Sequence, residues 1–218
     1  MTRRNPTIGL LMYYFYSAKG NLQISLLFAL ATGVALFITG NTIVYNFFVL
    51  ATMGLPSYII MIRMGAKNQL QWEKYQISMP IKRKNFTAAL YLSVLAALVA
   101  GLLLCVVLSS VTFIFNEELL HHVIKTAFET MAYVAGLVLL MFALLVPIGS
   151  TKFGESRGEV FFTICMIGAI VISLLISWLA NRAELSQVII SLLQVAISAV
   201  AFIISYHITT KIYSKIDF

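Results

Sequence analysis

Charged residues are scarce in this chain. Asp, Glu, Lys and Arg together make up 11% of its 218 residues, while 61% are hydrophobic and the mean hydropathy is +0.95. Soluble domains carry roughly a quarter charged residues, so this composition excludes an ordinary soluble protein. The sequence therefore predicts an all-α integral membrane protein in which residues 1–218 form one transmembrane domain.

Asp, Glu, Lys and Arg are missing from five long apolar runs of the sequence. Proton pumps and ion-coupled transporters need such groups at membrane depth, because those groups bind the driving ion. His207 alone lies within an apolar run, near the inner end of the last one, where we interpret it as an interfacial polar residue rather than a proton relay. If the protein moves a solute uphill, the energy must come from elsewhere.

Nucleotide-binding and catalytic patterns are also missing. No Gly is followed by Lys anywhere in the chain, which excludes a P-loop. The serines and threonines of the apolar runs have no acid or base partner that would activate them as nucleophiles. We therefore expect no enzyme activity from this chain and no cofactor bound to it.

One segment has metal-binding residue types. On a helix Glu118 and His122 would share a face, and Glu129 follows two turns later. The adjacent His121 and His122 would point about 100° apart, however, and nothing in the segment completes a tetrahedral shell. We expect a solvated amphipathic re-entrant or surface helix here and no metal.

Both cysteines lie in apolar runs and are interpreted as buried hydrophobic residues.

The lengths of the apolar runs predict six membrane spans. From Asn21 to Ile62 there are 42 residues without charge, which as one helix would reach about 63 Å, twice the roughly 30 Å hydrocarbon core. The chain must therefore turn back, and Gly40-Asn41-Thr42 is the turn-like group near the midpoint. We expect spans at residues 21–39, 43–62, 86–115, 130–150, 160–180 and 188–210.

The segment before the first span has its own pattern. Ile8, Leu11, Met12 and Phe15 are spaced as one apolar stripe of a helix, and Lys19 follows them. We expect an amphipathic interfacial helix at residues 6–19. The alternative is an extension of the first span.

The basic residues indicate how the chain crosses the membrane. Under this six-span scheme thirteen of the fifteen Lys and Arg residues fall on one side, which places both termini and residues 65–84 in the cytoplasm. The net charge of +7 is confined to the ends of spans, so it indicates anionic lipid headgroups of the bilayer and no nucleic acid. We expect a multi-pass protein of a bacterial plasma membrane.

Two prolines interrupt expected spans. Pro56 lies in the second span and Pro147 near the inner end of the fourth, and we name both as candidate hinges. A proline removes one backbone donor, so a kinked span is stable in lipid only where neighbouring groups satisfy the freed carbonyl.

The sequence EKYQISMPIKRK, residues 73–84, followed by a long span from Phe86, resembles the cytoplasmic loop between the second and third spans of ABC-2 type transporter permeases. In that family a pattern like E-x-Y-x-x-S-x-P-hydrophobic-x-[RK] precedes the third span. The six-span layout with both termini inside extends the resemblance to the whole chain. The chain is also similar to small permeases of Gram-positive exporters for amphipathic peptide toxins, of the phenol-soluble-modulin type.

This resemblance implies a fold, partners and a docking site. The fold would be that of a type V exporter-like half-permease, which pairs with itself or a sister chain and binds two separate cytoplasmic ATPase subunits that hold ATP and Mg. Residues 65–84 would form the coupling loop, with the ATPase-docking side chains Gln69, Leu70, Trp72, Glu73, Tyr75, Ser78 and Pro80. Lys82, Arg83 and Lys84 would hold the loop at the lipid headgroups. The alternative is that the aromatic residues only anchor the loop at the membrane interface.

The function that follows is a permease subunit of an ATP-binding-cassette exporter, whose dimer forms the translocation pathway. The cargo would be amphipathic or hydrophobic, for example a peptide toxin or an antimicrobial peptide. The alternative from another class is a non-transporting membrane protein, such as an immunity or sensory scaffold. An ATP-binding subunit encoded beside the gene would favour the permease.

Overall fold

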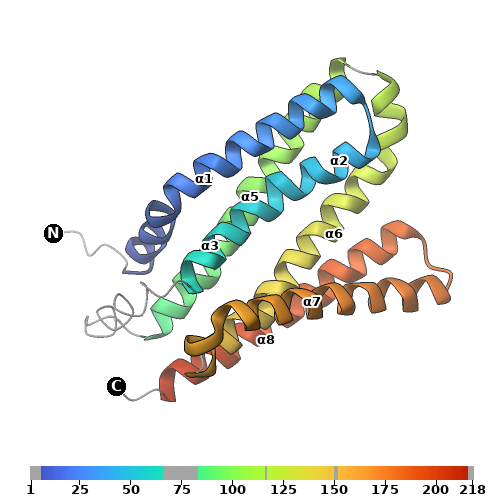
Figure 1. Cartoon of the computed structure of the whole chain (residues 1–218). Helices are drawn as coiled ribbons and strands as arrows, with labels where there is room; N and C mark the ends of the chain where they lie inside the picture. Colours follow the sequence, from blue (N-terminus) through green and yellow to red (C-terminus); the bar gives the residue numbers. More distant parts are fainter. Residues whose placement is uncertain (1–5, 66–82, 116, 150–151, 216–218) are drawn as a thin grey trace.

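The structure is a computed structural model, and it describes residues 6–65, 83–115, 117–149 and 152–215. Within these ranges the chain is helical apart from two short turns, and no strand is present. The helices are α1 Pro6–Thr39, α2 Thr42–Val49, α3 Leu55–Gly65, α5 Arg83–Phe115, α6 Glu117–Gly149, α7 Lys152–Arg182 and α8 Gln187–Lys215, and a π-helical segment, η1 Leu50–Gly54, joins α2 to α3 (Figure 1).

Six stretches of the described chain are long and apolar enough to cross a membrane. They are Thr7–Thr39, Thr42–Ile60, Lys84–Ile114, Thr126–Ile148, Thr163–Arg182 and Gln187–Ser214. The second stretch combines α2, η1 and the start of α3, so it is one broken helix rather than two spans. The predicted all-α fold with six membrane spans is confirmed.

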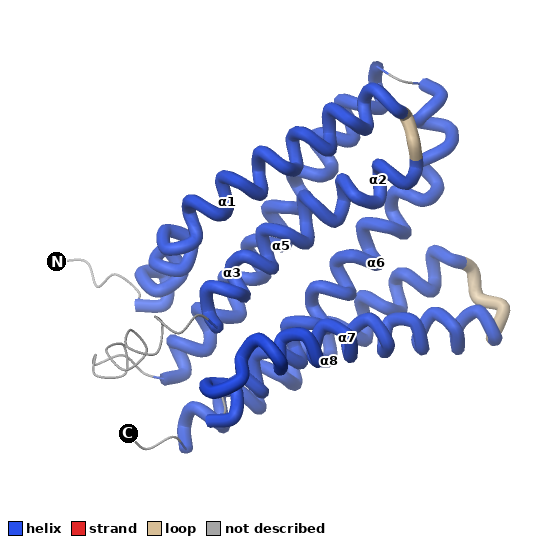
Figure 2. The backbone as a smooth tube through the Cα atoms, viewed as in Figure 1, coloured by secondary structure: helices blue, strands red, loops and turns tan. Residues whose placement is uncertain are grey.

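The helix ends gather at the two ends of the bundle. Figure 1 shows the start of α1, the end of α3, the start of α5 and the last turn of α8 at one end. The short turns between α1 and α2 and between α7 and α8, tan in Figure 2, lie at the other end. Residues 66–82 therefore connect two helices at the end of the bundle that holds both terminal helix ends, as a cytoplasmic connection between the second and third spans requires.

The first helix differs from the sequence prediction. Residues 6–19 and 21–39 were expected as an interfacial helix and a separate span, but α1 is continuous from Pro6 to Thr39. The reason is tertiary packing: Leu10, Tyr14 and Ala18 are buried in the core, and the Tyr14 ring lies 6.4 Å from the ring of Phe86 on α5. The face that packs on protein is thus Leu10, Tyr14 and Ala18, whereas Ile8 and Met12 of the predicted stripe are exposed, at 54% and 65%.

Two expected connections are also helical. The outer segment 117–129 was expected as a separate re-entrant or surface helix, and residues 151–159 as a short loop. In the structure α6 begins at Glu117 and α7 at Lys152, so each segment mainly extends the span that follows it. Continuing the helix satisfies backbone groups near the membrane boundary without any other partner.

The turn between α1 and α2 is built from two residues. Gly40 has φ 59°, a left-handed conformation that glycine adopts without strain, and its amide bonds the carbonyl of Leu36 at 2.9 Å. Asn41 then caps α2, because its side-chain oxygen accepts from the amide of Ile43 at 2.8 Å. The reversal therefore needs only two residues outside helix.

The last helix buries its polar side. Its buried polar residues are Ser191, Gln194, Ser198, Ser205 and Thr209, whereas leucines, isoleucines and valines cover its exposed face. A helix with its polar side buried and its apolar side exposed fits a lipid environment, where hydroxyl and amide groups can find partners only inside the protein.

A hydroxyl cluster joins α8 to α5. The hydroxyl of Tyr91 lies 2.6 Å from Ser205 Oγ and 2.9 Å from Thr209 Oγ1. Phe142 and Phe202 pack edge-on or tilted around the same ring, with centroids 5.4 and 4.9 Å away. Aromatic contacts of this kind hold three membrane helices together around one satisfied polar group.

The break in the second membrane helix is caused by Pro56. Proline has no N–H, so it cannot bond the carbonyl of Thr52 four residues earlier, and its ring crowds that carbonyl. The chain widens into the π-helical η1, in which the amide of Leu55 bonds the carbonyl of Leu50. The hydroxyl of Ser57 donates to the carbonyl of Met53 at 3.1 Å, which adds a partner beside the break.

Gly101 on α5 lies directly against this break. A Cβ at residue 101 would collide with the carbonyl oxygen of Thr52 and lie 2.9 Å from Cα of Met53. Both atoms belong to the backbone, so neither can rotate away. Glycine is therefore the residue that lets α5 approach η1, and this close packing holds the break in place.

We expect Gly101→Ala to lower the free energy of unfolding by about 1–3 kcal/mol, because the added methyl group overpacks two backbone atoms. The matched control is Gly20→Ala on α1, where a Cβ would meet nothing within 4 Å. Thermal unfolding of the purified protein in detergent measures both variants. Equal unfolding temperatures for the two variants would contradict the close packing at Gly101.

Candidate functional site

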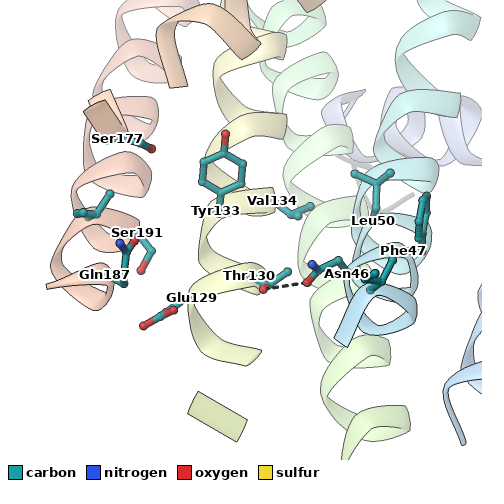
Figure 3. Close-up of a pocket in the computed structure, with 12 residues that line it drawn as sticks. Asn46, Phe47, Leu50, Glu129, Thr130, Tyr133, Val134, Ser177, Gln187 and Ser191 are labelled. Atoms are coloured by element: carbon teal, nitrogen blue, oxygen red, sulfur yellow. Dashed lines mark hydrogen bonds between the residues drawn. The ribbon is translucent and has the colours of Figure 1, made fainter. Parts of the chain in front are cut away.

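A groove of about 600 Å³ opens between the broken second helix and the bundle of α6, α7 and α8. Its lining residues are Ile43, Asn46, Phe47, Leu50, Glu129, Thr130, Tyr133, Val134, Ser177, Gln187, Ile190 and Ser191. Figure 3 shows Glu129 and Tyr133 between Gln187 and Ser191 on one side and Asn46, Phe47 and Leu50 on the other. This groove is the candidate functional site.

The walls of the groove are helical stripes. Ile43, Asn46 and Phe47 of α2 and Leu50 of η1 are spaced as i, i+3, i+4 and i+7, so they share one helical face. On α6 Glu129 and Tyr133 are one turn apart, and Thr130 and Val134 form a second such pair. The start of α8 contributes a similar stripe, in which Ile190 and Ser191 lie one turn after Gln187. Rigid helices therefore position every wall, and no long loop contributes.

Polar groups cluster at one end of an otherwise apolar lining. Thr130 Oγ1 donates to Asn46 Oδ1 at 3.3 Å across the two walls, and Gln187 Nε2 donates to Asn181 Oδ1 at 3.3 Å. Glu129 is partly buried, and no described side chain forms an ion pair with it. Among the described lining residues Glu129 is the one with a formal charge, so the groove presents a carboxylate beside apolar surface.

The groove lies at the end of the bundle that the charge distribution places outside. Glu129 is one turn inside the span that begins at Thr126, and Gln187 begins the last span. Asn46 is one turn beyond the start of α2 at Thr42. The orientation predicted from the charges would therefore place the site near the outer headgroups and the adjoining acyl chains, where polar and apolar parts of one ligand can both be bound.

The groove also touches the break in the second helix. Leu50 is both a lining residue and the first residue of η1. Beyond η1, α3 runs to Gly65, immediately before residues 66–82. One broken helix of 24 residues, about 36 Å long, thus runs from the wall of the groove to the predicted coupling loop.

The predicted docking residues lie mostly outside the described part of the chain. These are Gln69, Leu70, Trp72, Glu73, Tyr75, Ser78, Pro80 and Lys82. Arg83 and Lys84 form the first turn of α5, so they belong to a helix rather than to the loop, and the Lys84 side chain is exposed. Their docking and anchoring roles stay predictions.

The two candidate hinges have different settings. Pro56 follows the π-helical segment and lies in the first turn of α3, whereas Pro147 lies inside α6, two residues before its end at Gly149. The break at Pro56 lies in the middle of the second span, so it can change the direction of a long helix. A bend at Pro147 would redirect only the last residues of α6.

Sequence reasoning missed the groove residues. Glu129 was assigned to the outer segment, and Asn46, Tyr133 and Gln187 were read as ordinary span or loop residues. A signal was present, because Asn46 shares a helical stripe with apolar neighbours. Its pairing with Thr130, 84 residues later, could not be read from the sequence.

A second polar cluster is closed to ligands. Gln194 is fully buried and its Nε2 donates to Ser173 Oγ at 2.6 Å, linking α8 to α7. A Cβ at Gly136 on α6 would lie 2.8 Å from Gln194 Cγ. This cluster therefore packs three helices together and leaves no room for a ligand.

The groove's chemistry is that of a noncovalent binding site. Among the described lining residues there is no histidine or cysteine of the kind that activates a hydroxyl nucleophile. Among the described residues no group of three or more His, Cys, Asp or Glu side chains is placed to hold a metal ion. The side chains of His121 and His122 lie outside the described ones.

The family of the chain follows from comparison with known proteins. A family model described as ABC-2 family transporter protein matches residues 9–214, nearly the whole chain, so the protein belongs to this family. It is thus a multi-pass membrane component of an ABC transporter, with the role of a permease. No curated protein and no solved structure matches the chain.

We expect Ser177→Cys to react with a membrane-impermeant maleimide added outside intact cells, because Ser177 lines the groove. The control is Ser173→Cys, one turn earlier on α7, where the side chain is fully buried and should not react. Cys105 and Cys165 are buried and give a low background. Labelling of Ser177→Cys only after the cells are permeabilised would contradict an outward-facing groove.

Proposed function

We propose that the protein is the permease subunit of an exporter in the bacterial plasma membrane, driven by separate cytoplasmic ATPase subunits. Two permease chains, identical or related, form the translocation pathway. Residues 65–84 dock on the ATPase, which binds ATP and Mg, and the permease itself catalyses no reaction. The cargo is amphipathic or hydrophobic, with amphipathic peptides as the leading class.

The observation that carries this proposal is the chemistry of the buried polar groups. The buried polar side chains of the described chain are serines, threonines and Gln194, and none of them is ionisable. A transporter driven by protons or ions needs ionisable or charged ligands at membrane depth. Together with the family of the chain, this supports an energy source in another subunit.

The broken second helix supports the position of the docking segment. It connects the groove at one end of the bundle to residues 66–82 at the other, with a π-helical break between them. A movement imposed on residues 66–82 would reach the groove through α3 and η1, because Leu50 of η1 is one of the lining residues. π-Helical segments often occur at functional sites, where they allow a helix to shift.

The lining of the groove supports an amphipathic cargo. Ile43, Phe47, Leu50, Val134 and Ile190 provide apolar surface, and the polar residues gather beside Glu129. A wholly polar solute would leave the apolar part unfilled, and a wholly apolar one would leave the carboxylate and amides without partners. A molecule with both parts fits the groove best.

We expect the double variant Trp72→Ala/Tyr75→Ala to lose ATP-driven transport by tenfold or more, because buried aromatic anchors commonly contribute about 2 kcal/mol or more each to a docking interface. The readouts are cargo transport and cargo-stimulated ATPase activity in proteoliposomes that hold both subunits. The control is Trp178→Ala, since Trp178 is exposed on α7 at the other end of the bundle and stacks with Arg182.

Transport by the double variant at the unchanged, fully coupled rate would refute the docking assignment. Loss of transport in the Trp178→Ala control as well would show a general effect of removing aromatic residues.

A further inference from the structure

We infer that the groove binds a cationic amphiphile, with a primary ammonium group at Glu129 and an apolar segment along α2. The ligand class is that of a lysine-bearing amphipathic peptide or a simple alkylammonium ion. The inference deepens the proposed function and rests on it only in treating this ligand as cargo, because binding itself requires no ATPase.

Charge is the first argument. The groove lining carries one formal charge, that of Glu129, and no described basic side chain lines it. Arg182, the described cation on the last turn of α7, lies over the ring of Trp178 at 4.9 Å and is not part of the lining. A carboxylate in partly buried, apolar surroundings binds a cation more strongly than it would in water, because the local dielectric is lower.

Hydrogen-bonding capacity is the second argument. An ammonium group donates three hydrogen bonds and accepts none. The same lining holds oxygens that can accept hydrogen bonds in Gln187, Asn46 and Tyr133, on three different helices; Figure 3 shows Gln187 nearest Glu129, Asn46 across the groove, and the Tyr133 hydroxyl pointing away from Glu129. A phosphate or carboxylate would instead meet the negative charge of Glu129, so an anionic headgroup is disfavoured at this point.

The apolar wall is the third argument. Ile43, Phe47 and Leu50 form one face of α2, and Phe47 and Ile43 are more than half exposed, at 61% and 64%. An alkyl chain or the apolar face of a peptide lying along them would cover this surface at about 25 cal/mol per Å². Because Leu50 begins η1, the ligand's apolar part would contact the break in the second helix.

The experiment uses the full chain in nanodiscs of a zwitterionic lipid, without ATPase. The probe is a twelve-carbon alkylammonium ion that carries a diazirine near its tail, and its matched neutral probe is the corresponding alcohol. After photolysis, mass spectrometry counts adducts on residues 43–50 and 129–134. We expect the ammonium probe to label these residues at least tenfold more than the alcohol does at equal concentration.

The variant Glu129→Gln should remove this preference, so that the two probes label equally. The matched control is Glu184→Gln, because Glu184 is exposed on the α7–α8 turn and lies outside the groove lining. Lys125→Gln tests the basic residue one turn before Glu129 in the sequence and should leave the preference unchanged or increase it. Ile190→Phe should reduce labelling by both probes, since it fills the apolar part of the groove.

Three results would overturn the inference. They are equal labelling by the ammonium and alcohol probes in the unchanged protein, an ammonium preference that survives in Glu129→Gln, and a preference lost equally in Glu184→Gln. Failure of transport with intact ammonium binding would count against the proposed function instead, because the binding measurement contains no ATPase.

Discussion

The close approach of Gly101 to the carbonyl of Thr52 is the contact on which the arrangement of the helices depends. Pro56 has no backbone N–H to donate to this carbonyl, and the helix widens into the π-helical η1 just before it. Only a residue without Cβ on α5 permits the two backbones to pack there. The break is thereby fixed at one depth in the membrane, and it divides the second span into a half that lines the groove and a half that leads to residues 66–82.

Among the described residues no Asp, Glu, Lys, Arg or His side chain is fully buried, which points to the broken helix rather than to an ion site as the coupling element. Serine and threonine hydroxyls, with Gln194, make up the buried polar residues of the described chain, and none of them carries a charge that would bind a driving ion. Four buried polar atoms, Tyr45 OH, Ser109 Oγ, Gln194 Oε1 and Ser198 Oγ, have no hydrogen-bond partner among the described residues. Helices α6 and α8 pack closely where Gly136 contacts Gln194, so these two helices form a rigid part of the bundle. The broken second helix faces α6 and α8 across the groove. A force from the cytoplasm would act through this broken helix.

The sequence predicted the spans well because span length and hydropathy follow from the bilayer itself. It placed the turn at Gly40 and the break near Pro56, since both residues act on the local backbone. It gave the continuity of α1 only as the alternative, because that continuity depends on Tyr14 meeting Phe86, and it missed the groove, which depends on Asn46 meeting Thr130. Contacts between distant residues decide these features, and local patterns carry no information about such pairs.

The central claim is that energy enters the chain from an ATPase at residues 65–84. Its most direct test is a photo-crosslinking amino acid at Gln69 in living cells, with one at Gln187 as the control at the other end of the bundle. The account predicts that position 69 forms an adduct with an ATP-binding-cassette subunit, identified by mass spectrometry, and that position 187 does not. An adduct at position 69 with lipid alone, while the ATPase is present in the same cells, would contradict it.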